Sequence, residues 1–349
     1  MTGSNEYNRY IGRKWFALFA LITILLGVIL TSLSVGSSGL PLSEIFRVLF
    51  TTGGEATSRI IIFNVRMPRI ATGIVVGIAL AMAGCIMQNV LRNPLASAST
   101  LGVAQGASFG AAIAIVYFQA GIQIGTAAVA NPYMVTIFAF LGGIISTILI
   151  LLLSRIGGVT PSSMILAGVA LSAMFTGGTT LVQYFADDVR IASIVYWTFG
   201  NLGRAGWNEI SLIFILSAAA FLYFIANRWN YNAMESGTNT AKSLGVNVDA
   251  LILISMAVAT LISSVAIAFV GTINFIGLIA PHIVRKFVGN DYRFLIPCSA
   301  LMGAVIMLAA DIASRMIAAP AILPIGALTS FLGAPLFLYM IIKKGKILK

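Results

Sequence analysis

Few residues in this chain have the types and spacing needed for chemistry. The single histidine, His282, has no second ligand group at metal-binding spacing, and the two cysteines, Cys85 and Cys298, lie in separate apolar segments as expected of buried free thiols. The segment 236–243 reads SGTNTAKS, but serine and alanine stand where a Walker A loop needs glycines, and no strand precedes it. We therefore expect no catalytic residue, no metal site and no cofactor, and the chain is not expected to be an enzyme.

One carboxylate, Asp311, falls inside an apolar segment, which is the usual position of a residue that couples ion flow to transport. Arg315 follows four residues later, so both side chains share one helix face and can form an ion pair. A proton relay would place more ionisable groups deeper in the bilayer, so we expect an ion pair between Asp311 and Arg315 rather than a relay. The pattern suits the passage of a bulky solute powered from elsewhere better than an ion-coupled secondary transporter.

The elements that must position these residues are membrane helices. Hydrophobic residues make up 59% of the 349 residues and charged residues only 9%, which is too little charge for the surface of a soluble protein. Several runs near 20 residues carry no charge and could cross about 30 Å of hydrocarbon. We predict an all-α polytopic membrane protein in a lipid bilayer. The net charge of +11 does not indicate nucleic acid, because the basic residues form no patch with aromatic residues.

The apolar segments predict about ten spans in a single domain, residues 1–349. They lie near 15–33, 68–91, 98–118, 134–153, 164–185, 210–226, 250–270, 272–283, 294–316 and 326–342. The segment Thr272–Ile283 would measure only ~18 Å as a helix, so it is predicted to be a broken or half-length element. The segment Asp187–Trp207 mixes charged and aromatic residues and is predicted to lie at the membrane interface.

The distribution of basic residues predicts the orientation. If the half-length element crosses, fourteen of the 21 lysines and arginines fall on the side of the two termini and seven on the other side. The positive-inside rule then places both termini and the segment 227–249 in the cytosol. The expected location is the cytoplasmic membrane of a prokaryote.

Two glycine patterns predict local structure. Gly237 and Gly245 bracket SGTNTAKSLG inside the polar segment Asn227–Asp249, which we call the elbow, and predict a short helix with a break at each end. Composition alone favours an ordinary solvated loop there. Gly102, Gly106 and Gly110 recur every four residues and predict one helix face packed against another helix.

Seven motifs, in order along nearly the whole chain, carry a resemblance to a known family. They are RMPR at 66–69, AGCIMQNVLRNPLA at 83–96, LGVAQGASFG at 101–110, LAGVAL at 166–171, GTINFIGLIAPHIVR at 271–285, ADIASR at 310–315 and LPIGALTSFLGAPLF at 323–337. The chain resembles the FecCD-type permease subunits of ATP-binding cassette (ABC) importers for iron–siderophores, haem and vitamin B12. The resemblance implies a type II ABC importer permease fold of ten helices.

The resemblance also implies partners and a substrate. They are a second permease subunit, identical or paralogous, two cytosolic ATPase subunits, an extracytoplasmic binding protein and an iron–siderophore complex. A haem or cobalamin permease is the alternative within the family. A secondary transporter working alone, or a structural membrane protein without a substrate, are the alternatives outside it.

The resemblance implies three groups of site residues. Coupling to the ATPase is expected of Met234, Gly237, Ala241, Lys242, Leu244 and Gly245. Docking of the binding protein is expected of Arg66, Arg69 and Arg315, with headgroup anchoring, or for Arg315 the pair with Asp311, as the alternative. A cytoplasmic gate is expected of Thr160, Pro161, Ser162 and Ser163. The same residues also suit an ordinary helix start with proline in its first position, and Pro161 replaces a small hydroxyl residue of the B12 permease, which leaves the gate's chemistry open.

Overall fold

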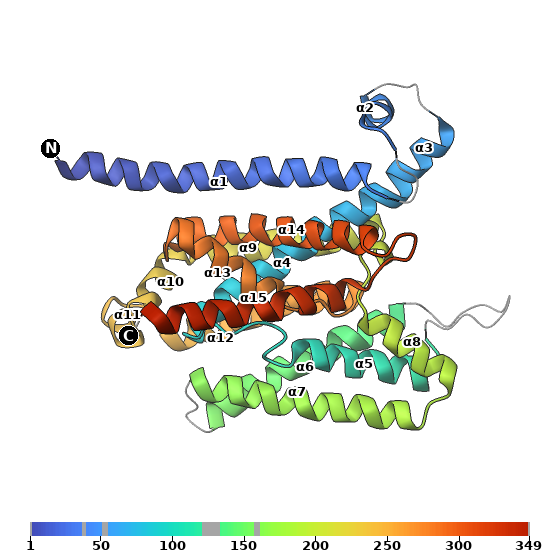
Figure 1. Ribbon diagram of the computed structural model, residues 1–349. Helices are drawn as coiled ribbons and strands as arrows, with labels where there is room; N and C mark the ends of the chain where they lie inside the picture. Colours follow the sequence, from blue (N-terminus) through green and yellow to red (C-terminus); the bar gives the residue numbers. More distant parts are fainter. Residues whose placement is uncertain (1, 37–39, 51–54, 121–132, 157–160, 348–349) are drawn as a thin grey trace.

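The computed structural model describes residues 2–36, 40–50, 55–120, 133–156 and 161–347, and all regular structure within these ranges is helical. Ten helices run side by side along one direction, as Figure 1 shows. They are α1 (Thr2–Ser34), α4 (Met67–Val90), α5 (Val103–Tyr117), α6 (Tyr133–Ile156), α7 (Pro161–Tyr184), α9 (Trp207–Ala226), α12 (Val248–Val270), α13 (Ile276–Val288), α14 (Tyr292–Met316) and α15 (Ile325–Ile347). The all-α fold of about ten spans is confirmed.

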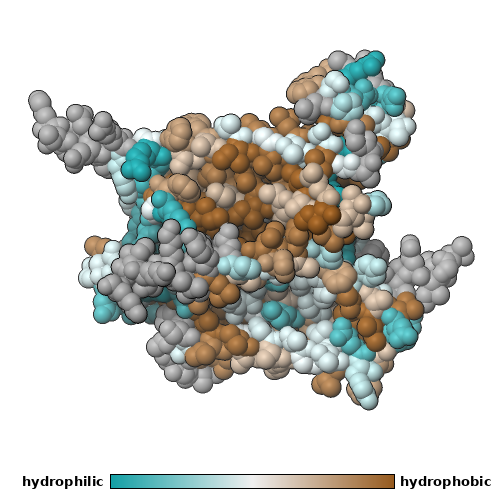
Figure 2. Space-filling model, in the orientation of Figure 1, coloured by the Kyte–Doolittle hydropathy of each residue, from teal (hydrophilic) through white to brown (hydrophobic). Residues whose placement is uncertain are grey.

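The surface has the banding of a membrane protein. Among the described residues, seven helical segments are long and apolar enough to cross a bilayer, and α5 and part of α15 are shorter apolar helices. Figure 2 shows a broad hydrophobic band across the middle of the molecule, with hydrophilic residues gathered toward both ends of the helices. In the most apolar stretch of the α4 segment 83% of the residues are buried, which makes α4 the central helix.

The two ends of the bundle carry different short helices. The start of α1, the end of α15, α10 (Arg228–Glu235) and α11 (Thr238–Ser243) lie at one end, called here the elbow end (Figure 1). At the opposite end, the far end, lie α2 (Leu42–Phe50), α3 (Ala56–Ile60) and α8 (Asp188–Thr198) (Figure 1). The predicted grouping of both termini with the elbow is therefore confirmed, whereas the side of the membrane on which they lie stays a prediction.

The α4 segment begins earlier than the sequence predicted. Helical structure starts at Ala56 and runs through a wide π-helical turn, Ile61–Arg66, directly into α4, whereas the span was predicted to begin at Pro68. Pro68 has no amide hydrogen, and its ring crowds the carbonyl group four residues earlier. The wider turn accommodates this proline without ending the helix.

The half-length element crosses the bundle, as predicted. An irregular stretch from Gly271 to Phe275 leads into α13, which has 13 residues and ends at Val288. The turn after α13 reaches the elbow, where Asn290 Nδ2 donates to Glu235 Oε1 at 2.6 Å and the Tyr292 amide donates to Asn232 Oδ1 at 2.8 Å. The irregular stretch, which begins against Trp197 of α8, and the short helix together connect the far end with the elbow.

Backbone contact at glycine joins α5 to α6. A Cβ added to Gly106 would overlap the carbonyl oxygen of Gly142, and one added to Gly110 would overlap that of Phe138. The predicted packed face is therefore confirmed for these two glycines. Gly102 differs, because it precedes the helix with φ +75° and is not part of its face.

We expect Gly106→Leu to lower the stability of the purified chain in detergent by about 1–3 kcal/mol, because the leucine cannot enter the contact with α6 without moving one of the helices. Gly27→Leu on α1 is the matched control, since a Cβ there meets no atom within 4 Å. The measurement is the midpoint of thermal unfolding. Equal midpoints for the two variants would contradict the packing explanation.

Candidate functional site

The elbow is built from two short helices separated by glycines. Gly237, with φ +122°, stands between α10 and α11, and Gly245, with φ +82°, ends α11. The Val246 amide donates to Ala241 O and the Gly245 amide donates to Lys242 O, both at 3.0 Å, which is the Schellman pattern of a helix end. The predicted short helix with a break at each end is confirmed.

Side chains of α10 fix the elbow to the bundle. Tyr231 and Met234 are fully buried, and the Tyr231 hydroxyl lies 2.8 Å from Ser255 Oγ on α12. Asn89 Nδ2 on α4 donates to the Tyr231 carbonyl at 3.1 Å. The elbow is thus an ordered part of the bundle rather than a loose solvated loop.

The predicted coupling residues divide into an anchored set and an exposed set. Met234 and Ala241 are fully buried, whereas Lys242, Leu244 and Gly245 are exposed. The Leu244 side chain is 68% exposed at the end of α11. The elbow therefore presents one large apolar side chain at its tip, amid small and polar residues.

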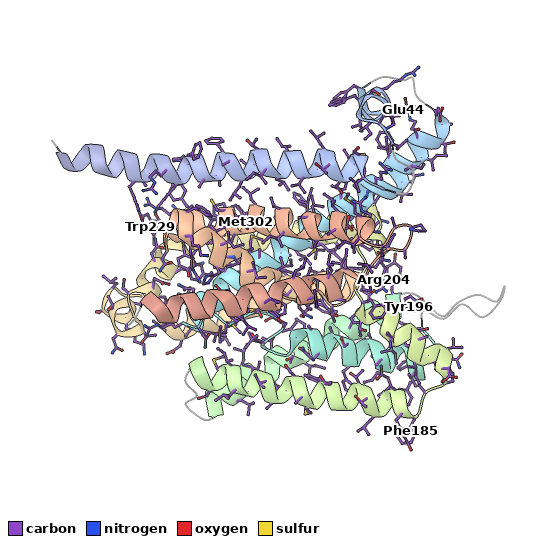
Figure 3. All side chains as sticks on the ribbon, viewed as in Figure 1. Glu44, Phe185, Tyr196, Arg204, Trp229 and Met302 are labelled. Carbon is purple, nitrogen blue, oxygen red and sulfur yellow. The ribbon has the colours of Figure 1, made fainter. Side chains whose placement is uncertain are left out.

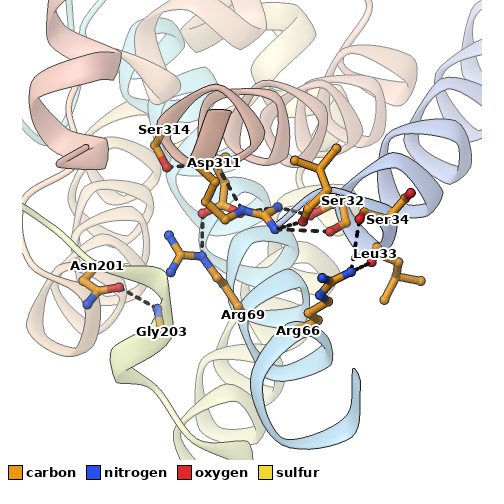
Figure 4. A network of polar contacts seen from close by, with 11 residues as sticks. Ser32, Leu33, Ser34, Arg66, Arg69, Asn201, Gly203, Asp311 and Ser314 are labelled. Carbon is orange, nitrogen blue, oxygen red and sulfur yellow. Dashed lines mark hydrogen bonds and ion pairs between the residues drawn. The ribbon is translucent and has the colours of Figure 1, made fainter. Parts of the chain in front are cut away.

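A second cluster of predicted site residues lies at the far end (Figure 4). Arg69 Nε lies 2.7 Å from Asp311 Oδ1, and Arg315 Nη2 lies 2.9 Å from Asp311 Oδ2, so one fully buried carboxylate holds two guanidinium groups. The predicted pair between Asp311 and Arg315 is confirmed. The contribution of Arg69, 242 residues away from Asp311, was not predicted.

The arginines of this cluster also cap the end of α1. Arg315 Nη1 donates to the carbonyl of Val35 at 2.6 Å and Nη2 donates to Ser32 Oγ at 2.7 Å, while Arg66 donates to the carbonyls of Leu33 and Ser34. The last carbonyls of a helix have no partner within it and carry partial negative charge, so guanidinium groups suit them well.

The three arginines predicted for docking therefore lie together at the far end, but their contacts are internal. Arg66 is only 5% exposed, and the side chains of Arg69 and Arg315 are 12% and 9% exposed. Docking of a partner at these side chains stays a prediction, and any partner would compete with Asp311 and with the end of α1.

The predicted gate is described only in part. Thr160 lies outside the described residues, and α7 begins at Pro161, with Ser162 and Ser163 in its first turn. The first described residue of α7 is thus a proline, which is the position that the helix-start interpretation gives it. The gating role stays a prediction.

Irregular backbone from three elements meets next to α8. The Asn201 amide donates to Val270 O at 2.7 Å and the Gly326 amide donates to Phe199 O at 2.9 Å. Any Cβ at Gly271 would overlap the Trp197 carbonyl, and one at Gly326 would overlap that of Thr272. Non-helical backbone in a membrane protein requires such protein partners, so α8, the stretch before α13 and the start of α15 form one joined unit.

A third polar cluster, at the elbow end, holds the beginning of α1. Lys14 is 1% exposed and its Nζ lies 3.1 Å from Asp291 Oδ2, while Arg293 Nη2 lies 2.7 Å from the same oxygen. Asn232 of α10 donates to Asp291 Oδ1 at 3.3 Å. Burial raises the pKa of Asp291, but hydrogen bonds from Arg293 and Lys14 outweigh it, so the pKa lies below its usual range.

No group of three or more His, Cys, Asp or Glu side chains within the described residues could hold a metal ion. The polar clusters are ion pairs and helix caps. Their geometry positions helices and supplies no nucleophile with a base.

Comparison with known proteins identifies the family. The FecCD transport family model matches residues 23–343. The chain belongs to the FecCD transport family. An archaeal relative from Methanocaldococcus jannaschii, named an ABC transporter permease protein, is 51% identical over 98% of both chains. The iron(3+)-hydroxamate import system permease protein FhuB of Bacillus subtilis is 36% identical over 97% of this chain and 86% of its own.

A solved structure supports the same assignment. The chain matches an inward-facing ABC transporter described as metal-chelate type, with a TM-score of 0.79 and 29% identity over 95% of this chain and 99% of that one. The FecCD chain is thus a polytopic membrane permease of a prokaryotic ABC importer, a system in which a separate ATPase hydrolyses ATP.

We expect Asp311→Asn to lower the free energy of unfolding by about 3–5 kcal/mol, because two buried guanidinium groups lose their counter-charge. Thermal unfolding in detergent measures the change, with Asp188→Asn on the exposed first residue of α8 as control. Adding Arg69→Gln to Asp311→Asn should recover part of the loss. If Asp311→Asn is as stable as Asp188→Asn, the ion pairs of Asp311 with Arg69 and Arg315 contribute nothing to the free energy of unfolding.

Proposed function

We propose that this permease moves an iron–siderophore complex across the cytoplasmic membrane, taking it from an extracytoplasmic binding protein, with ATP hydrolysed by two cytosolic subunits. The main support is the match of the family model over residues 23–343, joined with a relative named for iron(3+)-hydroxamate import and a structural neighbour of metal-chelate type. These relatives share the transport of a bulky iron or metal chelate.

A second permease subunit is part of the proposal, and α7 supports it. Only 22% of the residues in the most apolar stretch of α7 are buried. Thr176, Gly177 and Thr180 are exposed along the same helix. Small and hydroxyl residues favour contact with another helix over contact with lipid tails. In Figure 2 the surface between α15 and α7 is also paler than the hydrophobic band beside it. A polar chelate passing between two subunits would need such a surface.

The elbow is proposed to contact the ATPase. It is ordered, it is attached to α4, α12 and the turn between α13 and α14, and it exposes Leu244 at its tip. A partner that pushes on α11 would thus act on several spans at once. With the elbow in the cytosol, the far end, where Arg204 and Tyr196 lie in Figure 3, faces the binding protein.

An ion-coupled mechanism has little support in the contacts of Asp311. Its carboxylate is paired with Arg69 of α4 and Arg315 of α14, so its contacts are those of an internal ion-pair cluster that joins helices, and they leave no open position for a transported ion. Haem or cobalamin import is the remaining alternative, and it would use the same fold and partners.

Uptake into proteoliposomes tests the proposal. The permease is reconstituted with its co-purified ATPase and binding protein, and a ferric hydroxamate, haemin and cobalamin are offered separately. ATP-dependent uptake of the ferric hydroxamate alone is the expected result. Uptake of haemin or cobalamin instead would favour the alternative, and uptake driven by an ion gradient without the ATPase would exclude an ABC mechanism.

We expect Leu244→Glu to release the ATPase from the permease, because a charge at the exposed tip of α11 cannot enter an apolar pocket of a partner. Lys286→Glu, at an exposed position of α13 near the same end, is the control. Co-purification of the ATPase and its activity are measured on folded permease. If the ATPase stays bound and active in the Leu244 variant, the elbow does not couple the two proteins.

Docking at the far end gives a separate expectation. Removing one positive charge by Arg69→Gln should slow association of the binding protein and weaken its dependence on salt concentration, since charges near an interface mainly steer encounter. Surface-bound kinetics at several salt concentrations provide the test, after thermal unfolding has shown that the variant is folded. Association rates equal to those of the unaltered permease would count against docking at this cluster.

A further inference from the structure

Two adjoining cavities lie along the bundle between α9 and α14, the first of them at the elbow end. A cavity of about 400 Å³ lies among α1, α9 and α14 and is lined by Trp15, Arg228 and Arg293, among others. A second cavity, of about 310 Å³, is lined by Phe214, Phe221 and Leu301, among others. Pro297 lines both cavities, so the two adjoin, and together they are named here the α9–α14 furrow.

The residues of the furrow follow one face of each helix. On α9 and the start of α10, positions 214, 218, 221, 225 and 228 recur every three or four residues, and on α14 positions 294, 297 and 301 do the same. Fourteen residues separate Phe214 from Arg228, or ~21 Å of helix. Half of a bilayer, with its headgroup region, measures about 20–22 Å. The furrow therefore has the length of one lipid molecule in one leaflet.

The mouth of the furrow is basic and aromatic. Arg228 and Arg293 lie with their guanidinium carbons 5.7 and 5.1 Å from the ring centre of Trp229, which Figure 3 shows at the elbow end beside the start of α14. Trp15 of α1 lines the same mouth and is 48% exposed. Tryptophan at this level is typical of the membrane interface, where its ring meets lipid headgroups.

Among the side chains that the structure describes, positive charges outnumber negative ones at the mouth. The Asp291 carboxylate pairs with both Lys14 and Arg293, so one negative charge is shared by two positive charges. Arg228 adds a third positive charge, and its Nη1 donates to the carbonyl of Ile225 at 2.9 Å. A phosphate group at the mouth would balance the excess.

The deeper part of the furrow suits a hydrocarbon chain. Its walls are aromatic and aliphatic side chains, and Ala218 and Ala300 keep the floor open.

We propose that the α9–α14 furrow binds one anionic phospholipid from the leaflet at the elbow end, with its phosphate at Arg228 and Arg293 and one chain along Ala218 and Leu301. The length, the basic mouth and the apolar depth match the three parts of such a lipid. The proposal is independent of the transported substrate. A lipid in this position joins the beginning of α1 to the beginning of α10, and so lies next to the elbow.

Native mass spectrometry of the delipidated chain tests the proposal. Phosphatidylglycerol and phosphatidylcholine are added separately in detergent, and the lipid retained per chain is measured. We expect one phosphatidylglycerol to remain bound and phosphatidylcholine to bind several-fold more weakly. Equal retention of the two lipids would overturn the proposal. So would displacement of phosphatidylglycerol by millimolar glycerol 3-phosphate, because that result would indicate a phosphate site that uses no chain.

Two variants with matched controls separate headgroup from chain. Arg228→Gln should weaken binding of phosphatidylglycerol about fivefold, the effect of one basic residue near an anionic surface. Lys286→Gln, exposed on α13 near the same end, should leave it unchanged. Ala218→Phe fills the furrow and should also weaken binding, whereas Ala219→Phe, on the exposed neighbouring position, should not. Size-exclusion profiles show that each variant is folded, and unaltered binding in either test variant would refute the site.

Discussion

The bundle depends on the close approach of helix backbones at glycine. Lipid tails are as apolar as leucine, so membrane helices gain little from hydrophobic burial and must gain stability from tight contact. Gly77 of α4 meets Gly303 of α14, and Gly84 of α4 meets Gly277 of α13, with no room for a Cβ at either place. Because α4 is the central helix, these contacts set the spacing of α13 and α14 around it.

Within the described residues, two ion-pair clusters lie at the two ends of this glycine-packed core. Asp311 with its arginines lies at the far end, and Asp291 with Lys14 and Arg293 lies at the elbow end. In both clusters one carboxylate holds two cations, and in both the cluster ties α1 to α14. Placing the pairs near the ends, close to water and headgroups, limits the cost of burying charge.

Much of the fold could be predicted because its signals are local. The long apolar runs predicted the membrane spans, and Gly237 and Gly245 predicted the ends of the short helix in the elbow. The four-residue spacing of Asp311 and Arg315 predicted their ion pair. The early start of the α4 segment was missed because proline usually marks a helix start, and a π turn before Pro68 leaves no clear pattern. Gly102 fits the spacing of a helix face, yet its positive φ serves as the entry to α5.

The clusters could not be predicted because their members are far apart in sequence. Lys14 and Asp291 are 277 residues apart, and no local pattern links them. For the three arginines the sequence predicted the correct end of the bundle but not their internal contacts, since only the folded chain brings the end of α1 beside them. Long-range pairing of this kind is the main limit of reasoning from one sequence.

The two anchors of α1 fix its length. Lys14 and Ser32 are 18 residues apart, which is about five full turns, so both anchoring residues point from the same side of the helix. Inserting a single residue between them would turn one end by about 100° relative to the other and shift it by about 1.5 Å, so both clusters could not be satisfied at once. Natural variants of α1 should therefore tolerate exchanges on its lipid-facing side far better than any insertion or deletion, and indels in this helix would be found outside the interval between its anchors.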